Sequence, residues 1–163
     1  MRSYEFAEDY RKNDAIRRAD VGIGPYKRPP ISTAHTQMIR KYPMRNIALT
    51  LKYLGTAYHG WQVQKTVTTV GQTLEEAAAA VVGHPVHMTG CGRTDAGVHA
   101  RAMAANAYMD TEKTPEEIRD YMNRYLPDDI CVQEAKLAAD RFHARYRAVG
   151  KLYTYTCYVG DTK

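Results

Sequence analysis

The residues best suited to chemistry lie in one short stretch, Gly92-Arg93-Thr94-Asp95-Ala96-Gly97-Val98-His99-Ala100. Asp95 is flanked by small residues, so little would shield its carboxylate from a ligand. Gly92 and Gly97 permit backbone angles and close approaches that other residues resist. An ionised carboxylate in this setting can act as a nucleophile or a general base. The structural alternative is an Asx turn, in which Asp95 bonds its own backbone.

Two neighbours of Asp95 extend this chemistry. Arg93 lies two positions earlier, and residues two apart on an extended segment face the same way, so both side chains would point into one cleft. Arg93 would then keep Asp95 ionised or bind phosphate; the alternative is a solvated surface arginine. His99 can donate to RNA, but a buried histidine or one that caps a neighbouring segment is the more usual role. It has no partners at metal-ligand spacing, so we expect no metal site.

A second group of candidates runs from Arg141 to Tyr155, where cations alternate with aromatic residues. Cations bind phosphates and aromatic rings stack on exposed bases, so Arg145, Lys151 and Tyr153 are candidate RNA-binding residues. The alternative is an ordinary charged loop followed by a strand whose tyrosines fill the core.

The only tryptophan, Trp61, lies in the stretch Gly55 to Gln62. It either contacts a bound nucleotide or anchors this loop on the core.

Composition and charge divide the 163 residues at about position 43. Residues 1–43 hold nine Lys or Arg against five Asp or Glu, and residues 44–163 hold 14 against 13. Because the second part carries almost no net charge, any affinity for RNA there requires a local basic patch. No apolar run is long enough for a membrane span or a signal core. The number of cysteines is odd, which suits reduced thiols better than a set of disulfides, so we expect a cytoplasmic protein.

The same boundary separates two kinds of sequence. Residues 1–43 are predicted to be a poorly ordered basic extension, with a weak helical pattern from Tyr4 to Ala19 and irregular Gly/Pro-rich sequence beyond it. Met44, which we interpret as an ancestral start, opens a patterned domain over 44–163. The alternative is that residues 1–43 are a genuine basic arm that touches RNA.

The elements that must position the candidate residues follow from periodicity and caps. Alternation of apolar and polar residues predicts a strand over 46–53. Capping signals predict one helix that begins at Thr69 or Thr73 and ends at Val82. They predict a second helix that begins at Thr114-Pro115 and ends before Pro127. Further strands are predicted over 87–91, 102–109, 130–135 and 151–159. This order is the split βαβ pattern: an α+β fold, ferredoxin-like and similar to RNA-recognition modules, with two helices on one face of an antiparallel sheet.

These segments resemble the tRNA pseudouridine synthase A family over roughly residues 45–160. The family pattern is matched at Tyr58-His59-Gly60-Trp61-Gln62-Val63-Gln64, at Gly92 to Ala100, at Phe142-His143-Ala144-Arg145 and at Lys151 to Tyr153. The match at Gly92 to Ala100 is the most specific of these.

The resemblance implies a function and roles for single residues. Family members convert uridine to pseudouridine in the anticodon stem-loop of tRNA, as homodimers without metal or organic cofactor. By position, Asp95 resembles the essential aspartate, Arg93 the cleft arginine that helps to flip or hold the nucleotide, and Tyr153 the ring that stacks on the base. Flipping is needed because the glycosidic bond is otherwise shielded in the stack.

Family members also carry a second, similar half, which these 163 residues lack. That half contributes an arginine that pairs with the catalytic aspartate, so we expect little synthase activity from this polypeptide alone. The alternative is a non-catalytic RNA-binding module built on the same sheet.

Overall fold

The computed structural model describes residues 2–8, 42–157 and 159–160. The chain divides into two units, Gln37–Arg147 and a smaller one made of Met1–Thr36 with Ala148–Lys163. The larger unit carries the Asp95 loop.

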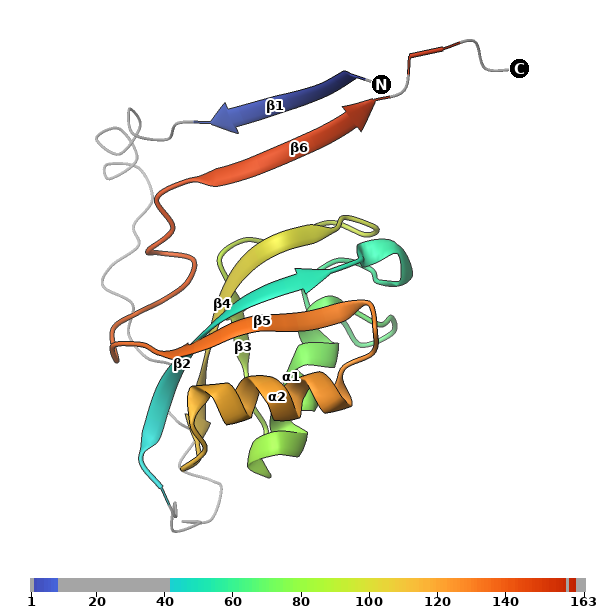
Figure 1. The fold of residues 1–163 in the computed structure, drawn as a ribbon. Coiled ribbons are helices and arrows are strands. Elements are labelled where there is room, and N and C mark those ends of the chain that lie inside the picture. Colours follow the sequence, from blue (N-terminus) through green and yellow to red (C-terminus); the bar gives the residue numbers. More distant parts are fainter. Residues whose placement is uncertain (1, 9–41, 158, 161–163) are drawn as a thin grey trace. The chain divides into compact units, whose positions relative to one another are not determined.

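The larger unit is built on a four-stranded antiparallel sheet in the order β3-β4-β2-β5. Both of its helices lie on the same side of this sheet (Figure 1). The expected α+β class, with an antiparallel sheet and two helices, is therefore confirmed. The elements are β2 (Met44–Tyr53), α1 (Val70–Val82), β3 (Met88–Gly90), β4 (Ala100–Asp110), α2 (Pro115–Tyr125) and β5 (Ile130–Leu137), with a short 3-10 helix at Gly55–Ala57.

The alternation in β2 sorts its side chains between the two faces of the sheet, as the sequence predicted. Ile47, Leu49, Leu51 and Tyr53 are at most 2 % exposed and belong to the core. That core also includes inward residues of both helices, among them Leu74, Ala78, Ile118 and Met122. The face of the sheet that turns away from the helices is called the open face below.

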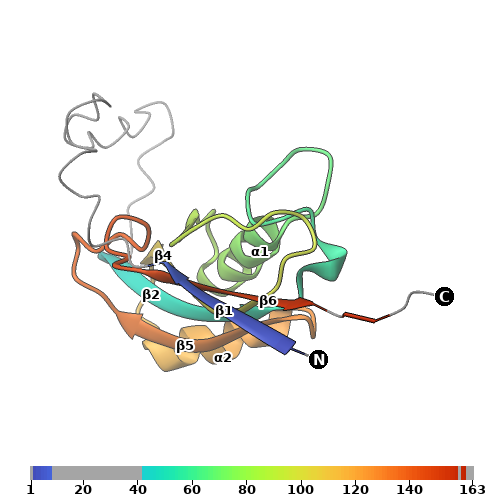
Figure 2. The same ribbon diagram turned by 90° about the horizontal axis from the view of Figure 1, so that it is seen from above.

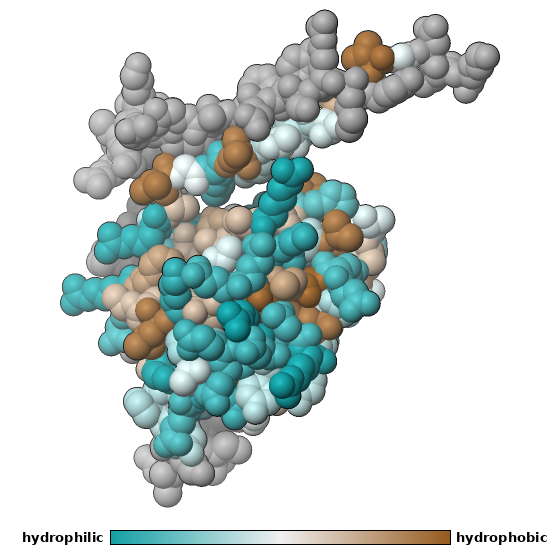
Figure 3. Space-filling view, in the orientation of Figure 1, coloured by the Kyte–Doolittle hydropathy of each residue, from teal (hydrophilic) through white to brown (hydrophobic). Residues whose placement is uncertain are grey.

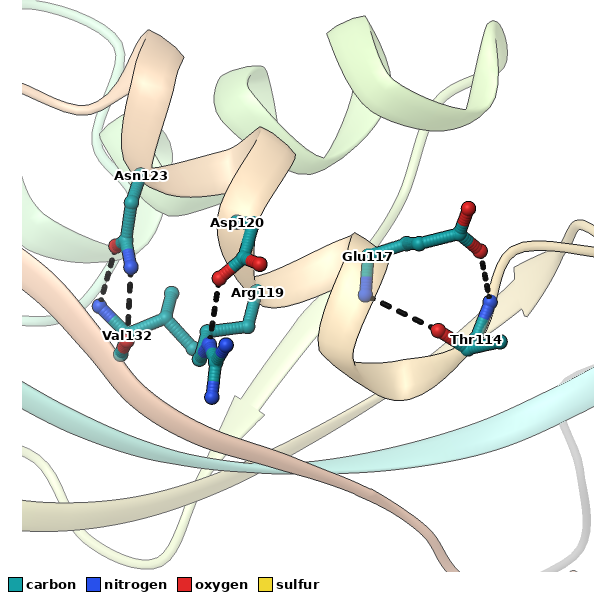
Figure 4. Close-up of polar contacts among 6 residues, drawn as sticks. All are labelled: Thr114, Glu117, Arg119, Asp120, Asn123 and Val132. Atoms are coloured by element: carbon teal, nitrogen blue, oxygen red, sulfur yellow. Dashed lines mark hydrogen bonds and ion pairs between the residues drawn. The ribbon is translucent and has the colours of Figure 1, made fainter.

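Local capping chemistry fixes where the helices begin. Of the two candidate caps of α1, Thr69 is the one used: its side chain accepts from Gln72 N, and Gly83 ends the helix with a left-handed φ of 78°. At α2, Thr114 and Glu117 form the predicted reciprocal capping box (Figure 4). Such caps are worth about 1 kcal/mol each because they satisfy otherwise unpaired N–H groups.

The outer face of α2 is mainly hydrophilic, with hydrophobic side chains in separate spots (Figure 3). This matches the exposed charges of Glu116, Glu117, Asp120 and Arg124 on that helix. No helix within residues 2–8, 42–157 and 159–160 is long and apolar enough to cross a membrane.

The smaller unit contains a two-stranded antiparallel sheet of β1 (Arg2–Glu8) and β6 (Lys151–Cys157) (Figures 1 and 2). The register runs from Arg2 opposite Cys157 to Glu8 opposite Lys151. The helix expected from Tyr4 is therefore wrong over Tyr4–Glu8, because pairing with β6 outweighs a weak local preference. Met1 and residues 9–41 of the predicted extension lie outside the described residues.

Candidate active site

The Asp95 loop joins β3 to β4 and closes through its main chain. Val98 N donates to Asp95 O at 3.2 Å, and Gly97, the third residue of this turn, has a φ of +79°. A positive φ at that position is the requirement of a type II turn, which favours glycine. Within the described part of the chain, the Asp95 carboxylate has no hydrogen bond or ion pair and is exposed. The turn thus leaves that carboxylate free, unlike the Asx turn considered above.

A second loop, residues 54–61, is hydrogen-bonded to the Asp95 loop. Trp61 N donates to Thr94 O at 3.0 Å, and Gly97 N donates to Tyr58 O at 3.2 Å. These bonds hold Thr94, the residue before Asp95, and Gly97, two positions after it. Because the bonds use main-chain groups, they fix the backbone on both sides of Asp95 and leave its side chain exposed.

Two glycines make this contact between loops possible. A Cβ at Gly60, whose φ is +82°, would lie 2.5 Å from Thr94 O. A Cβ at Gly55 would lie 2.1 Å from Val98 O. Real Cβ atoms essentially never approach this closely, so both positions require glycine for steric reasons.

His99 provides a side-chain tie between the same loops. Gly55 N donates to His99 Nδ1 at 2.9 Å, at the start of the 3-10 helix. The nitrogen that accepts this bond carries no proton, so the ring proton lies on Nε2. His99 is exposed and accepts from the first N–H of the 3-10 helix, as a capping residue does. The described residues hold no group of three or more His, Cys, Asp or Glu that could bind a metal ion.

Two tyrosine hydroxyls brace the loops from the core. Tyr53 Oη and Thr94 Oγ1 are hydrogen-bonded at 2.9 Å, and burial raises the pKa of Tyr53. Tyr58 Oη donates to Asp129 Oδ1 at 2.6 Å; burial, and then the bond to Asp129, raise the pKa of Tyr58 well above its usual value. Both hydroxyls therefore stay protonated at neutral pH. Neither hydrogen bond follows from the sequence, because Thr94 and Asp129 are distant in sequence from the tyrosines they bind.

The sequence candidates near Asp95 differ in exposure. Arg93 is exposed and, among the described residues, forms no ion pair with Asp95. Trp61 is only 4 % exposed and belongs to the core, where a Cβ at Gly90 would lie 2.7 Å from its ring. Its position matches the anchoring alternative, so direct RNA contact by Trp61 is not part of our proposal.

Residues 138–147, called the basic segment below, are bonded to the end of β2 that lies opposite the Asp95 loop. Arg145 is exposed in the segment 138–147, whose first residue donates from Ala138 N to Asn46 O at 2.8 Å. The Asp95 loop instead borders Tyr53, seven positions farther along β2, or roughly 23 Å at about 3.3 Å per residue. Lys151 and Tyr153 are exposed on β6, in the smaller unit.

Comparison with known proteins identifies the family. A family model described as tRNA pseudouridine synthase matches residues 49–147, which include both the Asp95 loop and Arg145. The chain belongs to the tRNA pseudouridine synthase family. The match covers more than half of the chain and ends before Lys151.

Curated relatives named tRNA pseudouridine synthase A agree with this assignment. The protein from Ruminiclostridium cellulolyticum is 43 % identical over 115 residues, which are 71 % of this chain and 47 % of that protein. The protein from Geobacter sp. strain M21 is 46 % identical over 120 residues, 74 % of this chain and 49 % of that protein. The chain thus spans about half the length of the curated relatives it matches.

Proposed function

We propose that this chain carries the catalytic loop of a tRNA pseudouridine synthase and that Asp95 is its catalytic residue. The observation that carries this proposal is the exposed Asp95 carboxylate, which has no partner within the described residues while the backbone around it is held by main-chain bonds. Preorganised groups of this kind lower reaction barriers because they need little rearrangement when charge develops.

The proposed reaction breaks the N1–C1′ glycosidic bond of uridine and forms a C5–C1′ bond after the base rotates. The proton on C5 leaves and N1 gains a proton, so atoms and charge balance without an oxidant or metal. Asp95 would either attack the nucleotide covalently or assist glycosidic cleavage; both routes need an ionised, accessible carboxylate. The base must leave the stack for either route.

The remaining candidates are assigned to RNA contact. Arg93, exposed two residues before Asp95, would bind phosphate or hold the flipped nucleotide. Arg145 and Lys151 would bind the RNA backbone, and Tyr153 would stack on the target base. Their exposure supports these roles.

We further propose a fold type, a substrate site with its assembly, and a cellular location. The strand order β3-β4-β2-β5, with a helix between the first two strands in sequence and another between the last two, supports a ferredoxin-like split βαβ arrangement. The substrate site would be the anticodon stem-loop, bound by a homodimer. Three free cysteines support the expected cytoplasmic location.

The test is tritium release from tRNA labelled at C5 of uridine, with protein in excess so that one slow turnover is visible. We expect release that depends on Asp95: the near-isosteric Asp95→Asn abolishes it while tRNA binding is retained. Release that is unchanged in Asp95→Asn would refute the catalytic assignment.

A non-catalytic RNA-binding module is the second candidate. It is favoured by exposed arginines in the segment 138–147 that form no ion pair among the described residues. Equal tRNA binding by the unaltered chain and Asp95→Asn, with release by neither, would favour this alternative.

A further inference from the structure

Two buried asparagine side chains meet on the open face of the sheet. Asn46 of β2 is 0 % exposed and Asn106 of β4 is 3 % exposed. Asn106 Nδ2 donates to Asn46 Oδ1 at 2.9 Å. A buried amide is costly unless its groups are hydrogen-bonded, so the remaining partners of this pair are informative.

Those partners all belong to the segment 138–147. Asn46 Nδ2 donates to Ala139 O and to Phe142 O, both at 2.9 Å. Asn106 Oδ1 accepts from Ala144 N at 2.8 Å, and Ala144 is itself 3 % exposed. Because every partner is a main-chain group, the pair fixes the path of this segment whatever side chains it carries.

The anchored segment presents its cations to solvent. Arg141, Arg145 and Arg147 are exposed, and none forms an ion pair with another described residue. Arg147 N donates to His143 O at 3.0 Å, and the His143 ring stacks on Tyr146 with 4.2 Å between centroids. The arginines therefore project from a backbone that is held both internally and against the sheet.

We propose that Asn46 and Asn106 are positioning residues, which hold the segment 138–147 so that its three arginines form a preformed binding element for RNA phosphates. This inference rests on the proposed function for its ligand. A fixed backbone reduces the entropy lost when arginines engage phosphates. Loss of the pair would release the segment and weaken RNA binding through arginines that the asparagines do not touch.

The test uses Asn106→Ala with Asn123→Ala as a matched control. Asn123 also makes two side-chain to main-chain hydrogen bonds, with Val132 N and O, but it lies on α2 (Figure 4). Each variant is combined with Arg145→Gln, and tRNA affinity is measured against salt concentration. In the unaltered and Asn123→Ala backgrounds, Arg145→Gln lowers the salt slope by about one.

In the Asn106→Ala background, the same Arg145→Gln change should lower the slope by less than half as much, because Arg145 is no longer held in place. Equal effects of Arg145→Gln in all three backgrounds would overturn the positioning role, since a merely structural asparagine would leave the contribution of Arg145 unchanged.

Trypsin gives a readout without RNA. Cleavage after Arg141, Arg145 and Arg147 should be at least about tenfold faster in Asn106→Ala than in Asn123→Ala, because local opening exposes the segment. Equal cleavage rates would overturn the anchoring.

Hydrogen exchange in the unaltered chain avoids any folding defect of the variants. The Ala144 amide should be protected, and exchange at the rate of a free amide would refute the anchor. If the unaltered chain binds no tRNA, the proposed function is wrong, and so is the inferred role of the arginines in RNA binding. Trypsin cleavage and hydrogen exchange would still decide whether the asparagines anchor the segment.

Discussion

Gly60 offers the sharpest test of how the Asp95 loop is held. In Gly60→Ala, the new Cβ would lie 2.5 Å from Thr94 O, about 0.9 Å inside the 3.4 Å at which ordinary van der Waals contact begins. The obstacle is a main-chain oxygen rather than a flexible side chain, so the backbone next to Asp95 must move. That movement would break the 3.0 Å bond from Trp61 N to Thr94 O.

The chain supplies a matched control in Gly83. Its φ is +78°, close to the +82° of Gly60, but a Cβ at Gly83 would meet nothing within 4 Å. In both variants, left-handed strain of about 1–2 kcal/mol is partly offset by about 0.4–1 kcal/mol from the less flexible unfolded chain. Gly60→Ala additionally leaves a buried group unpaired, which costs about 1–3 kcal/mol.

Urea unfolding should therefore show Gly60→Ala to be less stable than Gly83→Ala by about 1–3 kcal/mol. Amide NMR shifts of Thr94 to Gly97 should move in Gly60→Ala alone. Where Asp95-dependent tritium release is measurable, it should fall about 100-fold, the expected effect of a misplacement near 1 Å. Equal stabilities, with unmoved amide shifts in this loop, would refute the steric reasoning.

Three further predictions concern side chains of the two loops and of the segment 138–147. His99→Ala should lower the free energy of unfolding by about 1 kcal/mol relative to His99→Asn, whose amide oxygen can still accept from Gly55 N; equal urea midpoints would contradict this bond. Tyr58→Phe should cost about 1.5–3 kcal/mol, the usual value for a hydrogen bond to a carboxylate such as Asp129; a loss under about 0.5 kcal/mol in urea unfolding would contradict it. Burial, and then a neighbouring arginine, lower the pKa of His143, so the unfolded chain binds its proton more readily. The contribution of His143 to the free energy of unfolding should be fully present above about pH 6.5, and it should fall as the pH drops toward the lowered pKa of His143. His143→Gln should reduce this fall, measured by urea unfolding at about pH 7 and about pH 5.5.

Much of the fold follows from local sequence. The alternation from Ile47 to Tyr53 predicts which strand face is buried, and the Thr114-Pro115 signal predicts the start of α2, because both depend on residues close together in the chain. Val86 and Leu126, which the stripes and caps do not explain, are buried by segments that only meet after folding.

Some features of the candidate site also follow from local sequence, and others require the folded chain. The sequence alone predicts a carboxylate at Asp95 between glycines and implies the family, because motif and spacing are local properties. It leaves two roles open for Trp61, whereas the structure buries this ring beside Gly90.

Only the tertiary structure pairs Asn46 with Asn106, brings Gly60 against Thr94 and places the basic segment at the opposite end of β2 from the Asp95 loop. The physical reason is long-range packing. A hydrogen bond between residues 60 positions apart leaves no periodic trace in the sequence, and its cost or benefit depends on which segments fold together.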